Sequence, residues 1–222
     1  MISIVCVKRG EALVLDRGEN NYIPGFPMPS EDADRWNSRY REDAQNFIKT
    51  ARSLLKEHSS ILPTCGLALD IAMGLGDNSI YLSKRGMRVI GVEISLVALR
   101  KAKRKLPDLM AVVADLQHFY IPNNYFDVII CFLYLQRDLW LPMTQGLKIG
   151  GVMFIECLTE DILSIHPEID PNFLLKPGEL QQAFLLSDIE SKLEIIHYYE
   201  GWQSTDKSHP RAVASLIARR IA

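Results

Sequence analysis

A glycine-rich turn is the first place in this sequence where residue types and spacing point to chemistry. Residues 68–78 read Ala-Leu-Asp-Ile-Ala-Met-Gly-Leu-Gly-Asp-Asn. Gly74 and Gly76 carry no Cβ, so the backbone there can approach a ligand closely. Ser79 stands where a dinucleotide-binding G-x-G-x-x-G turn would have its third glycine. Asp70, at the end of the preceding apolar run, would repel a pyrophosphate, so the turn favours a ligand that carries positive charge.

Three further acids support the same interpretation. Asp77 lies inside the turn itself. Glu93 ends the next apolar run, about 20 residues past the glycines, where a carboxylate can accept both hydroxyls of a ribose. Asp115 ends a third run, where it can accept from an adenine amino group while Leu116 packs on the ring. S-Adenosylmethionine has an ammonium, a sulfonium, a ribose and an adenine, so it fits this set better than a nicotinamide dinucleotide does.

Asp70, Glu93 and Asp115 stand at the ends of successive predicted strands, in a part of the sequence where strands and helices alternate. Strands are expected at 67–71, 88–94, 109–114, 126–133 and 152–158, and helices at 78–85, 95–106 and 138–148. This alternation predicts right-handed crossovers and a parallel sheet. Two more β-rich runs, 193–199 and 212–221, are expected to pair as a hairpin. The predicted fold is α/β: a Rossmann-like, doubly wound, seven-stranded, mostly parallel sheet with an antiparallel edge strand and helices on both faces.

The first 30 residues differ from the rest of the chain. They hold two short β-like runs and then a stretch rich in Gly and Pro, which indicates an N-terminal extension or hairpin with a linker. Residues 31–222 are predicted to form one domain. Its first segment, 31–58, has a helical pattern on which Trp36 and Tyr40 share one face, because they are four residues apart. We expect this segment to be a helical lid.

Composition narrows the class of protein further. The chain has 222 residues, 48% of them hydrophobic, and a net charge of −2, so nothing in its charge favours nucleic acid as a partner. The basic run 100–105 is expected to be a solvated face at a helix C-terminus. No apolar run has the roughly 18 residues of a membrane span, so we expect no membrane partner and a cytoplasmic location. Cysteines and histidines are scattered, so no metal site is expected, and Cys131 and Cys157 are expected to be buried free thiols.

Four stretches of the sequence together resemble the successive motifs of class I S-adenosylmethionine-dependent methyltransferases. They are Asp70–Gly76, Val92–Ser95, Ala114–Leu116 and Phe126–Cys131. Four other stretches resemble the tellurite-resistance and thiopurine methyltransferase-like branch: Arg35–Arg41, Asp127–Arg137, Phe154–Thr159 and Asn172–Leu180. The resemblance covers residues 31–221. The turn departs from the branch at Met73 and Asp77, where Cys and Arg are usual.

The resemblance implies a role for each matched position. Backbone near Gly74 and Gly76 would hold the methionine part of the cofactor, with Asp70 on its ammonium side. Cys131 backbone would lie beside the sulfonium, and the lid aromatics would fold over the cofactor. The full set of expected cofactor-binding residues is Trp36, Tyr40, Asp70, Ala72, Gly74, Gly76, Asn78, Glu93, Ile94, Asp115, Leu116 and Cys131.

The acceptor side carries a weaker signal. Residues 131–134 lack the Asn/Asp-Pro-Pro-aromatic pattern that methylases of bases and glutamines carry, which argues against those acceptors. Tyr134 and Arg137 are the expected catalytic-side residues, because a hydroxyl and a guanidinium can orient an oxyanion. Arg137 could instead be a surface residue at a helix start, and Glu156 could be a pocket base or a plain strand-end acid.

The predicted function is methyl transfer to a small-molecule acceptor, either an oxyanion such as tellurite or selenite, or a thiol. Two alternatives stay open. One is a non-catalytic S-adenosylmethionine-binding regulatory protein, and the other is a nicotinamide-dependent oxidoreductase, which Asp70, Asp77 and the missing third glycine disfavour. The sequence names neither the acceptor nor the oligomeric state.

Overall fold

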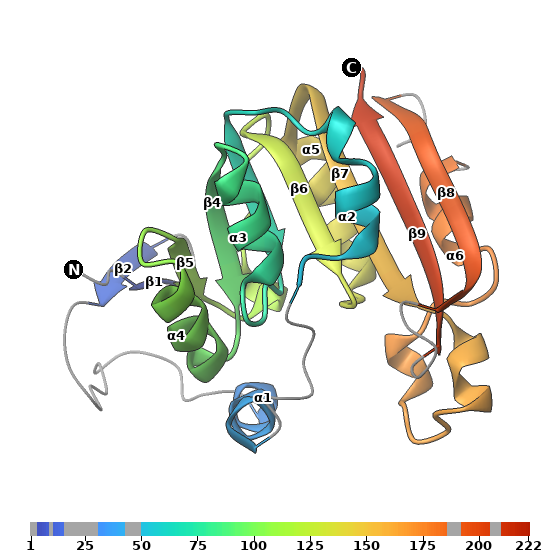
Figure 1. Cartoon of the computed structure of the whole chain (residues 1–222), viewed down its shortest axis with the longest axis horizontal. Helices are drawn as coiled ribbons and strands as arrows, with labels where there is room; N and C mark the ends of the chain where they lie inside the picture. The colour runs from blue at the N-terminus through green and yellow to red at the C-terminus, as the bar shows by residue number, and fades with distance from the viewer. Residues whose placement is uncertain (1–3, 9–10, 16–30, 43–49, 186–191, 205–209) are drawn as a thin grey trace. The chain divides into compact units, whose positions relative to one another are not determined.

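The structure, a computed structural model, describes residues 4–8, 11–15, 31–42, 50–185, 192–204 and 210–222 (Figure 1). The expected linker before residue 31 and residues 43–49 of the expected lid lie outside these ranges. Among the helices of the described ranges, none has the length and hydropathy needed to cross a membrane.

All seven predicted strands are present, and two more precede them. The strands are β1 (Ile4–Lys8), β2 (Glu11–Leu15), β3 (Leu67–Ile71), β4 (Arg88–Glu93), β5 (Met110–Val113), β6 (Phe126–Phe132), β7 (Leu147–Leu158), β8 (Leu193–Ser204) and β9 (Pro210–Arg220). Their hydrogen-bonded order is β2-β1-β5-β4-β3-β6-β7-β9-β8. The α-helices are α1 (Glu31–Glu42), α2 (Ser53–Glu57), α3 (Asp77–Lys84), α4 (Leu96–Lys105), α5 (Trp140–Gly146) and α6 (Glu179–Leu185). The predicted α/β, Rossmann-like fold is confirmed.

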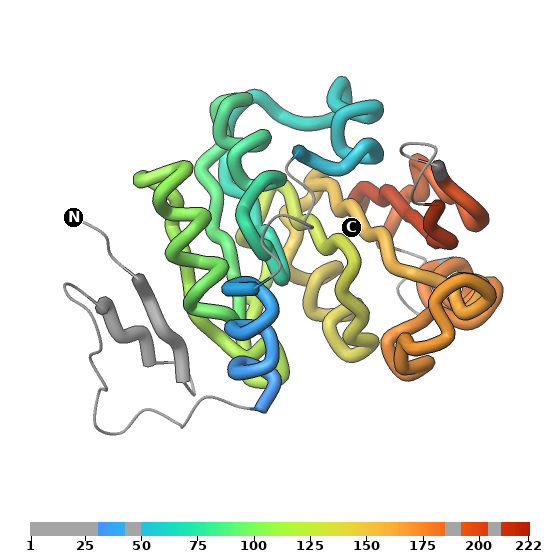
Figure 2. Tube along the Cα trace, turned by 60° about the horizontal axis from the view of Figure 1, so that its bottom comes forward, coloured from blue at the N-terminus to red at the C-terminus, as the bar shows by residue number. Residues whose placement is uncertain are grey.

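The chain divides into two compact units. The first unit consists of Met1–Ala51 and Leu69–Tyr120, and the second of Arg52–Ala68 and Ile121–Ala222. In the Cα trace of Figure 2, α1 of the first unit is the blue tube and β9 of the second is red.

In the first unit, β4 and β5 pair in parallel, and α3 and α4 pack against them (Figure 1). The two β-like runs near the N-terminus form the expected hairpin, since β1 pairs antiparallel with β2. β1 also pairs in parallel with β5, so the hairpin extends the sheet. Helix α4 begins where Ser95 was expected to cap it: the Ser95 hydroxyl accepts the N–H of Ala98.

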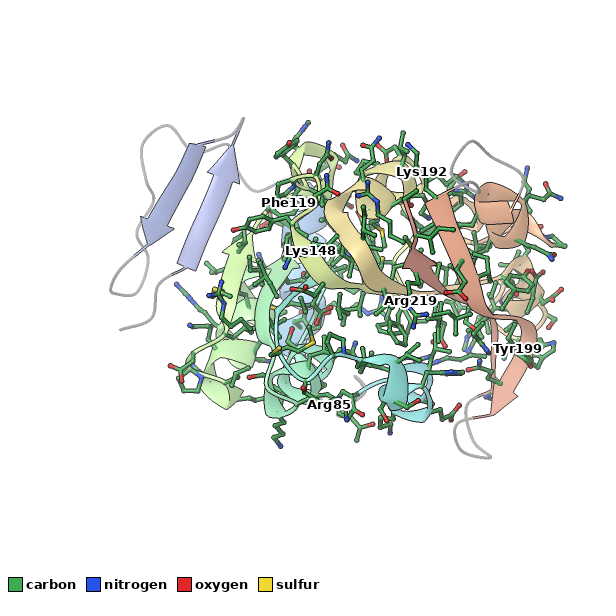
Figure 3. The ribbon with its side chains drawn as sticks, turned by 90° about the horizontal axis from the view of Figure 1, so that it is seen from above. Arg85, Phe119, Lys148, Lys192, Tyr199 and Arg219 are labelled. Atoms are coloured by element: carbon green, nitrogen blue, oxygen red, sulfur yellow. The ribbon has the colours of Figure 1, made fainter. Side chains whose placement is uncertain are left out.

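In the second unit, β6 and β7 pair in parallel, and β9 pairs antiparallel with both β7 and β8. The expected C-terminal hairpin is therefore present, with β9 antiparallel to both of its neighbours and β8 at the edge of the sheet. The Asp127 carboxylate anchors the start of β6, because it accepts from Leu67 N–H at 2.8 Å and from Lys148 Nζ at 2.9 Å. Lys148 is labelled in Figure 3.

Two expected helices have different bounds from those predicted. The helical pattern of 31–58 appears as α1 and the short α2, and residues 50–52 between them are not helical. Arg52 has extended backbone angles, φ −57 and ψ 144, and its buried guanidinium forms an ion pair with Glu156. The helix expected at 138–148 ends at Gly146, because Leu147 and Lys148 already belong to β7. A left-handed Gly150, with φ 84, then allows the irregular register between β6 and β7.

Candidate functional site

The acids expected at strand ends lie together in the first unit. Asp70 belongs to β3, Glu93 ends β4, and Asp115 follows β5 by two residues. Glu93 pairs in register with Val113, and its carbonyl accepts the N–H of Ala114 at 3.2 Å. Carboxyl ends of parallel strands are where open α/β sheets bind ligands, so this arrangement is a candidate site.

The glycine-rich turn between β3 and α3 has left-handed backbone at three positions. The φ angles are 53° at Ala72, 54° at Gly74 and 75° at Gly76. Alanine rarely adopts this conformation, so the turn stores strain at Ala72, as functional sites often do. The less usual Met73 is accommodated by Gly91 of β4, where a Cβ would collide with its thioether. Asn78 lies in the first turn of α3.

Glu93 is held by backbone donors on both carboxylate oxygens. Gly74 N–H donates to its Oε2 at 2.9 Å and Ser95 N–H to its Oε1 at 2.8 Å. The residue is only 4% exposed, and burial raises its pKa while the backbone donors oppose that rise. A carboxylate has about four lone-pair sites, so both oxygens retain capacity to accept from a diol.

Asp70 is buried even more deeply, at 1% exposed. Its Oδ2 accepts from the Ser79 hydroxyl at 2.6 Å. Burial raises the pKa of Asp70 to about 7; the Ser79 hydrogen bond opposes this, and the nearby Glu93 charge adds to it. In the described part of the chain, neither Asp70 nor Glu93 forms an ion pair. Buried carboxylates without a counter-charge are costly, so a cationic ligand such as S-adenosylmethionine fits this site and a pyrophosphate does not.

Asp77 behaves differently from the other acids. Its carboxylate pairs with Lys105 Nζ at 3.0 Å, and the same ammonium donates to the Leu75 carbonyl at 3.2 Å. Its charge is therefore already balanced within the protein. Of the two turn acids used to argue for a cationic ligand, only Asp70 lacks a basic partner among the described residues.

Asp115 and Leu116 form the turn after β5. Asp115 caps a short 3-10 helix, since its Oδ1 accepts the N–H of Gln117 at 3.0 Å. Leu116 is buried beside it, and Ile94 follows Glu93 at the end of β4. The assignment of these residues to adenine and ribose stays a prediction.

Helix α1 packs on the same part of the first unit. The rings of Trp36 and Tyr40 are 5.8 Å apart, and both pack in a cluster with Leu75 and Ala98. A Cβ on Gly74 would lie 2.8 Å from Tyr40 Oη. The expected lid aromatics therefore lie against the glycine-rich turn.

Cys131 and Tyr134 lie in the second unit. The thiols of Cys131 and Cys157 are both buried, as expected, and both lie within hydrogen-bond distance of the Tyr134 carbonyl, at 3.4 and 3.2 Å. Burial raises the pKa of the Cys157 thiol to about 12. The Tyr134 hydroxyl donates to Gln136 Oε1 at 2.6 Å. Leu133, just before it, has a left-handed φ of 56°, a strained conformation that no sequence pattern signals.

Arg137 has protein partners on all sides of its guanidinium. It forms a bidentate pair with Glu179, with NH2 to Oε2 at 2.9 Å, and donates to the carbonyls of Asn172 and Leu174 at 3.3 and 3.1 Å. It thereby connects the segment before α6 to the short 3-10 helix Arg137–Leu139 that precedes α5. Glu156 also has a partner, the buried Arg52, rather than standing alone as a pocket base would.

The structure thus gathers most of the predicted cofactor residues in one unit. These are Trp36, Tyr40, Asp70, Ala72, Gly74, Gly76, Asn78, Glu93, Ile94, Asp115 and Leu116. Cys131, Tyr134 and Arg137 belong to the second unit. Sequence reasoning missed Asn37, Lys105 and Arg52, whose partners are distant along the chain.

The basic run 100–105 is not simply a solvated face. Lys103 is 5% exposed and donates to the Leu109 carbonyl at 2.8 Å, while Lys101 donates to the Tyr40 carbonyl and Lys105 pairs with Asp77. Half of the run therefore stabilises the first unit itself. In the described ranges, no group of three or more His, Cys, Asp or Glu side chains is arranged to hold a metal ion.

Comparison with known proteins agrees with this geometry. Residues 68–148 match the family model of a methyltransferase domain. No curated protein sequence matches the chain. The matched segment contains the glycine-rich turn and the four acids Asp70, Asp77, Glu93 and Asp115.

Solved structures share the fold at low sequence identity. An S-adenosylmethionine-dependent methyltransferase from Listeria monocytogenes has a TM-score of 0.61 at 16% identity, covering 75% of this chain and 96% of its own. TehB from Haemophilus influenzae has a TM-score of 0.61 at 19% identity, covering 85% and 66%. A Haloferax volcanii methyltransferase in complex with the activator Trm112 has a TM-score of 0.64 at 14% identity, covering 88% and 98%.

The fold, the site and the family match define the class of protein. The chain is a methyltransferase with the class I fold. S-Adenosylmethionine is the cofactor that the sequence predicts, and its positive charge fits the buried Asp70 and Glu93 of this site.

Proposed function

We propose that this methyltransferase acts on a small-molecule nucleophile, an oxyanion or a thiol, as the tellurite-resistance and thiopurine methyltransferase-like branch does. The branch assignment rests on the sequence stretches that resemble it. The likeness to TehB is consistent with the branch but concerns the fold alone.

The main support for S-adenosylmethionine as the cofactor is that Asp70 and Glu93 are buried and form no ion pair in the described ranges. S-Adenosylmethionine supplies a methyl group activated by its sulfonium. Asp70 would neutralise the ammonium, Glu93 would accept the ribose hydroxyls and Asp115 would accept from the adenine amino group. Trp36 and Tyr40 would cover the cofactor and exclude water, which favours displacement at a positioned methyl group.

On the acceptor side, we assign Tyr134 and Arg137 to binding of the methyl acceptor, and Cys131 backbone stays a predicted contact of the cofactor. Arg137 keeps a role in acceptor binding only if an anion competes with Glu179 for its guanidinium. A soft anionic nucleophile needs little help from a general base, so the ion-paired Glu156 and the high-pKa Cys157 are not required as bases.

A small acceptor is preferred to nucleic acid because the basic run is engaged inside the first unit. Lys101, Lys103 and Lys105 all donate to groups of their own chain. The expected cytoplasmic location stays a prediction.

An acceptor screen tests this proposal. Purified protein would be mixed with S-adenosylmethionine and tellurite, selenite, thiols or carboxylates, with tRNA and a protein extract as macromolecular alternatives. Formation of S-adenosylhomocysteine with one small acceptor is the expected result. Turnover with tRNA or protein alone would replace the small-molecule assignment, and binding without turnover on any acceptor would favour the regulatory alternative.

A further inference from the structure

Asn37 on α1 contacts the start of α4 through its side chain. Its Oδ1 accepts the hydroxyl of Ser95 at 2.8 Å and the N–H of Val97 at 3.1 Å. Asn37 lies one residue after Trp36 and three before Tyr40, so it belongs to the part of α1 that meets the glycine-rich turn.

Ser95 connects Asn37 to the ribose acid. Its hydroxyl donates to Asn37 and accepts from Ala98 N–H, and its own N–H donates to Glu93 Oε1 at 2.8 Å. Ser95 is fully buried. Ser95 therefore forms hydrogen bonds with both Glu93 and Asn37.

A second path leads from Glu93 back to the same helix. Gly74 N–H donates to Glu93 Oε2 at 2.9 Å, and Gly74 faces the Tyr40 hydroxyl. Burial, and after it the negative charge of Glu93, raise the pKa of Tyr40. Lys101 of α4 also donates to the Tyr40 carbonyl.

We propose that Asn37 is a positioning residue that couples cofactor binding at Glu93 to the docking of α1. The proposal rests on the cofactor assignment to Glu93. Asn37 touches neither cofactor nor acceptor; it acts through Ser95, so that α1 docks tightly when Glu93 is fixed by its ligand and less tightly when it is not. Asn37 would then be the residue that holds α1, the expected lid helix, against the rest of the first unit.

The test compares Asn37→Ala, Asn37→Asp and the matched control Ser38→Ala, an exposed neighbour on the same helix. Calorimetry would measure the Kd for S-adenosylhomocysteine, and hydrogen exchange would measure protection of residues 31–42 with and without it. Asn37→Ala loses two hydrogen bonds, so its Kd should rise about five- to tenfold and ligand-dependent protection of α1 should disappear. Asn37→Asp keeps the acceptor oxygen beside the α4 N-terminus and should restore both, and Ser38→Ala should match wild type.

Each outcome decides between the proposals. If wild type binds S-adenosylhomocysteine and Asn37→Ala keeps both its Kd and its ligand-dependent protection, the coupling is refuted while the cofactor site stands. If wild type does not bind, the assignment to Glu93 and the coupling both fail. An equal rise in Kd in Asn37→Ala and Asn37→Asp would also refute the coupling, because only Asn37→Ala removes the side-chain oxygen that accepts from Ser95 and Val97.

Discussion

Gly74 N–H donates to Glu93 Oε2 at 2.9 Å, so the glycine-rich turn and the acid at the end of β4 form one hydrogen-bonded unit. The two residues are 19 positions apart in the chain, and each was expected to touch a different part of the cofactor. Because they share a hydrogen bond, a change at the turn should also disturb ribose binding.

Gly74→Ala tests the turn. A Cβ there would lie 2.8 Å from Tyr40 Oη, and the left-handed φ of 54° adds strain of about 1–2 kcal/mol. We expect affinity for S-adenosylhomocysteine to fall at least about tenfold in calorimetry, with an unchanged circular dichroism spectrum. The matched control is Gly150→Ala, which has a φ of 84° but no atom within 4 Å of the new Cβ. Equal affinity in both variants would mean that the turn is structural.

Asp70 should make the cofactor-free protein less stable as pH rises. Burial raises its pKa from 3.8 to about 7, so between these values the folded state binds more protons than the unfolded state does. The stability that this group contributes is complete below about pH 4 and is lost as pH rises through about 7. Asp70→Asn removes this titration and leaves an acceptor for Ser79, so urea unfolding should find it more stable than wild type at pH 8 but not at pH 4.

The control for that experiment is the exposed Asp108→Asn. It should change stability little at either pH. A difference between Asp70→Asn and wild type that is independent of pH would show that Asp70 stays ionised in the fold, and would remove the argument for a missing counter-charge.

Substitutions of Arg137 and of its partner Glu179 distinguish an acceptor-binding role of Arg137 from a structural one. If the guanidinium binds the acceptor, Arg137→Ala should raise KM for the acceptor found in the screen and spare cofactor affinity, and Arg137→Lys should restore little because it lacks the planar fork. Glu179→Gln is the matched partner variant, since it weakens the bidentate pair but leaves the arginine free to bind an anion. It should leave KM unchanged or lower it.

A structural role for Arg137 gives the opposite pattern. Arg137→Ala and Glu179→Gln would then both lower the melting temperature, by similar amounts, and both leave steady-state kinetics as in wild type. That result would remove Arg137 from the acceptor site without affecting the methyltransferase assignment.

Much of the fold could be predicted because its determinants are local. Short apolar runs between helix-like segments predicted the parallel strands, and Ser95 before a periodic segment predicted the start of α4. The acids at strand ends followed from the rule that parallel strands present their carboxyl ends on one edge. In the structure, Asp70, Glu93 and Asp115 belong to one unit.

The remaining features depend on contacts between residues far apart in sequence. Asn37 reaches Ser95 across 58 positions, and Arg52 reaches Glu156 across 104. No period or motif encodes such a pair. Arg52, inside the segment 31–58 that has a helical pattern, is not helical and forms this buried ion pair directly before α2. Likewise, Lys105 neutralises Asp77, which by residue type alone was indistinguishable from a ligand-binding acid.

The central claim is that S-adenosylmethionine binds at the strand-end acids of the first unit, with Glu93 on its ribose. Calorimetric titration of wild type, Glu93→Ala and the control Asp108→Ala with S-adenosylhomocysteine tests it most directly. Wild type and the control should bind one ligand per chain, and Glu93→Ala should bind at least about tenfold more weakly, a loss of roughly 1.5–3 kcal/mol for a charged hydrogen-bond acceptor. An unchanged Kd for a folded Glu93→Ala protein would contradict the account.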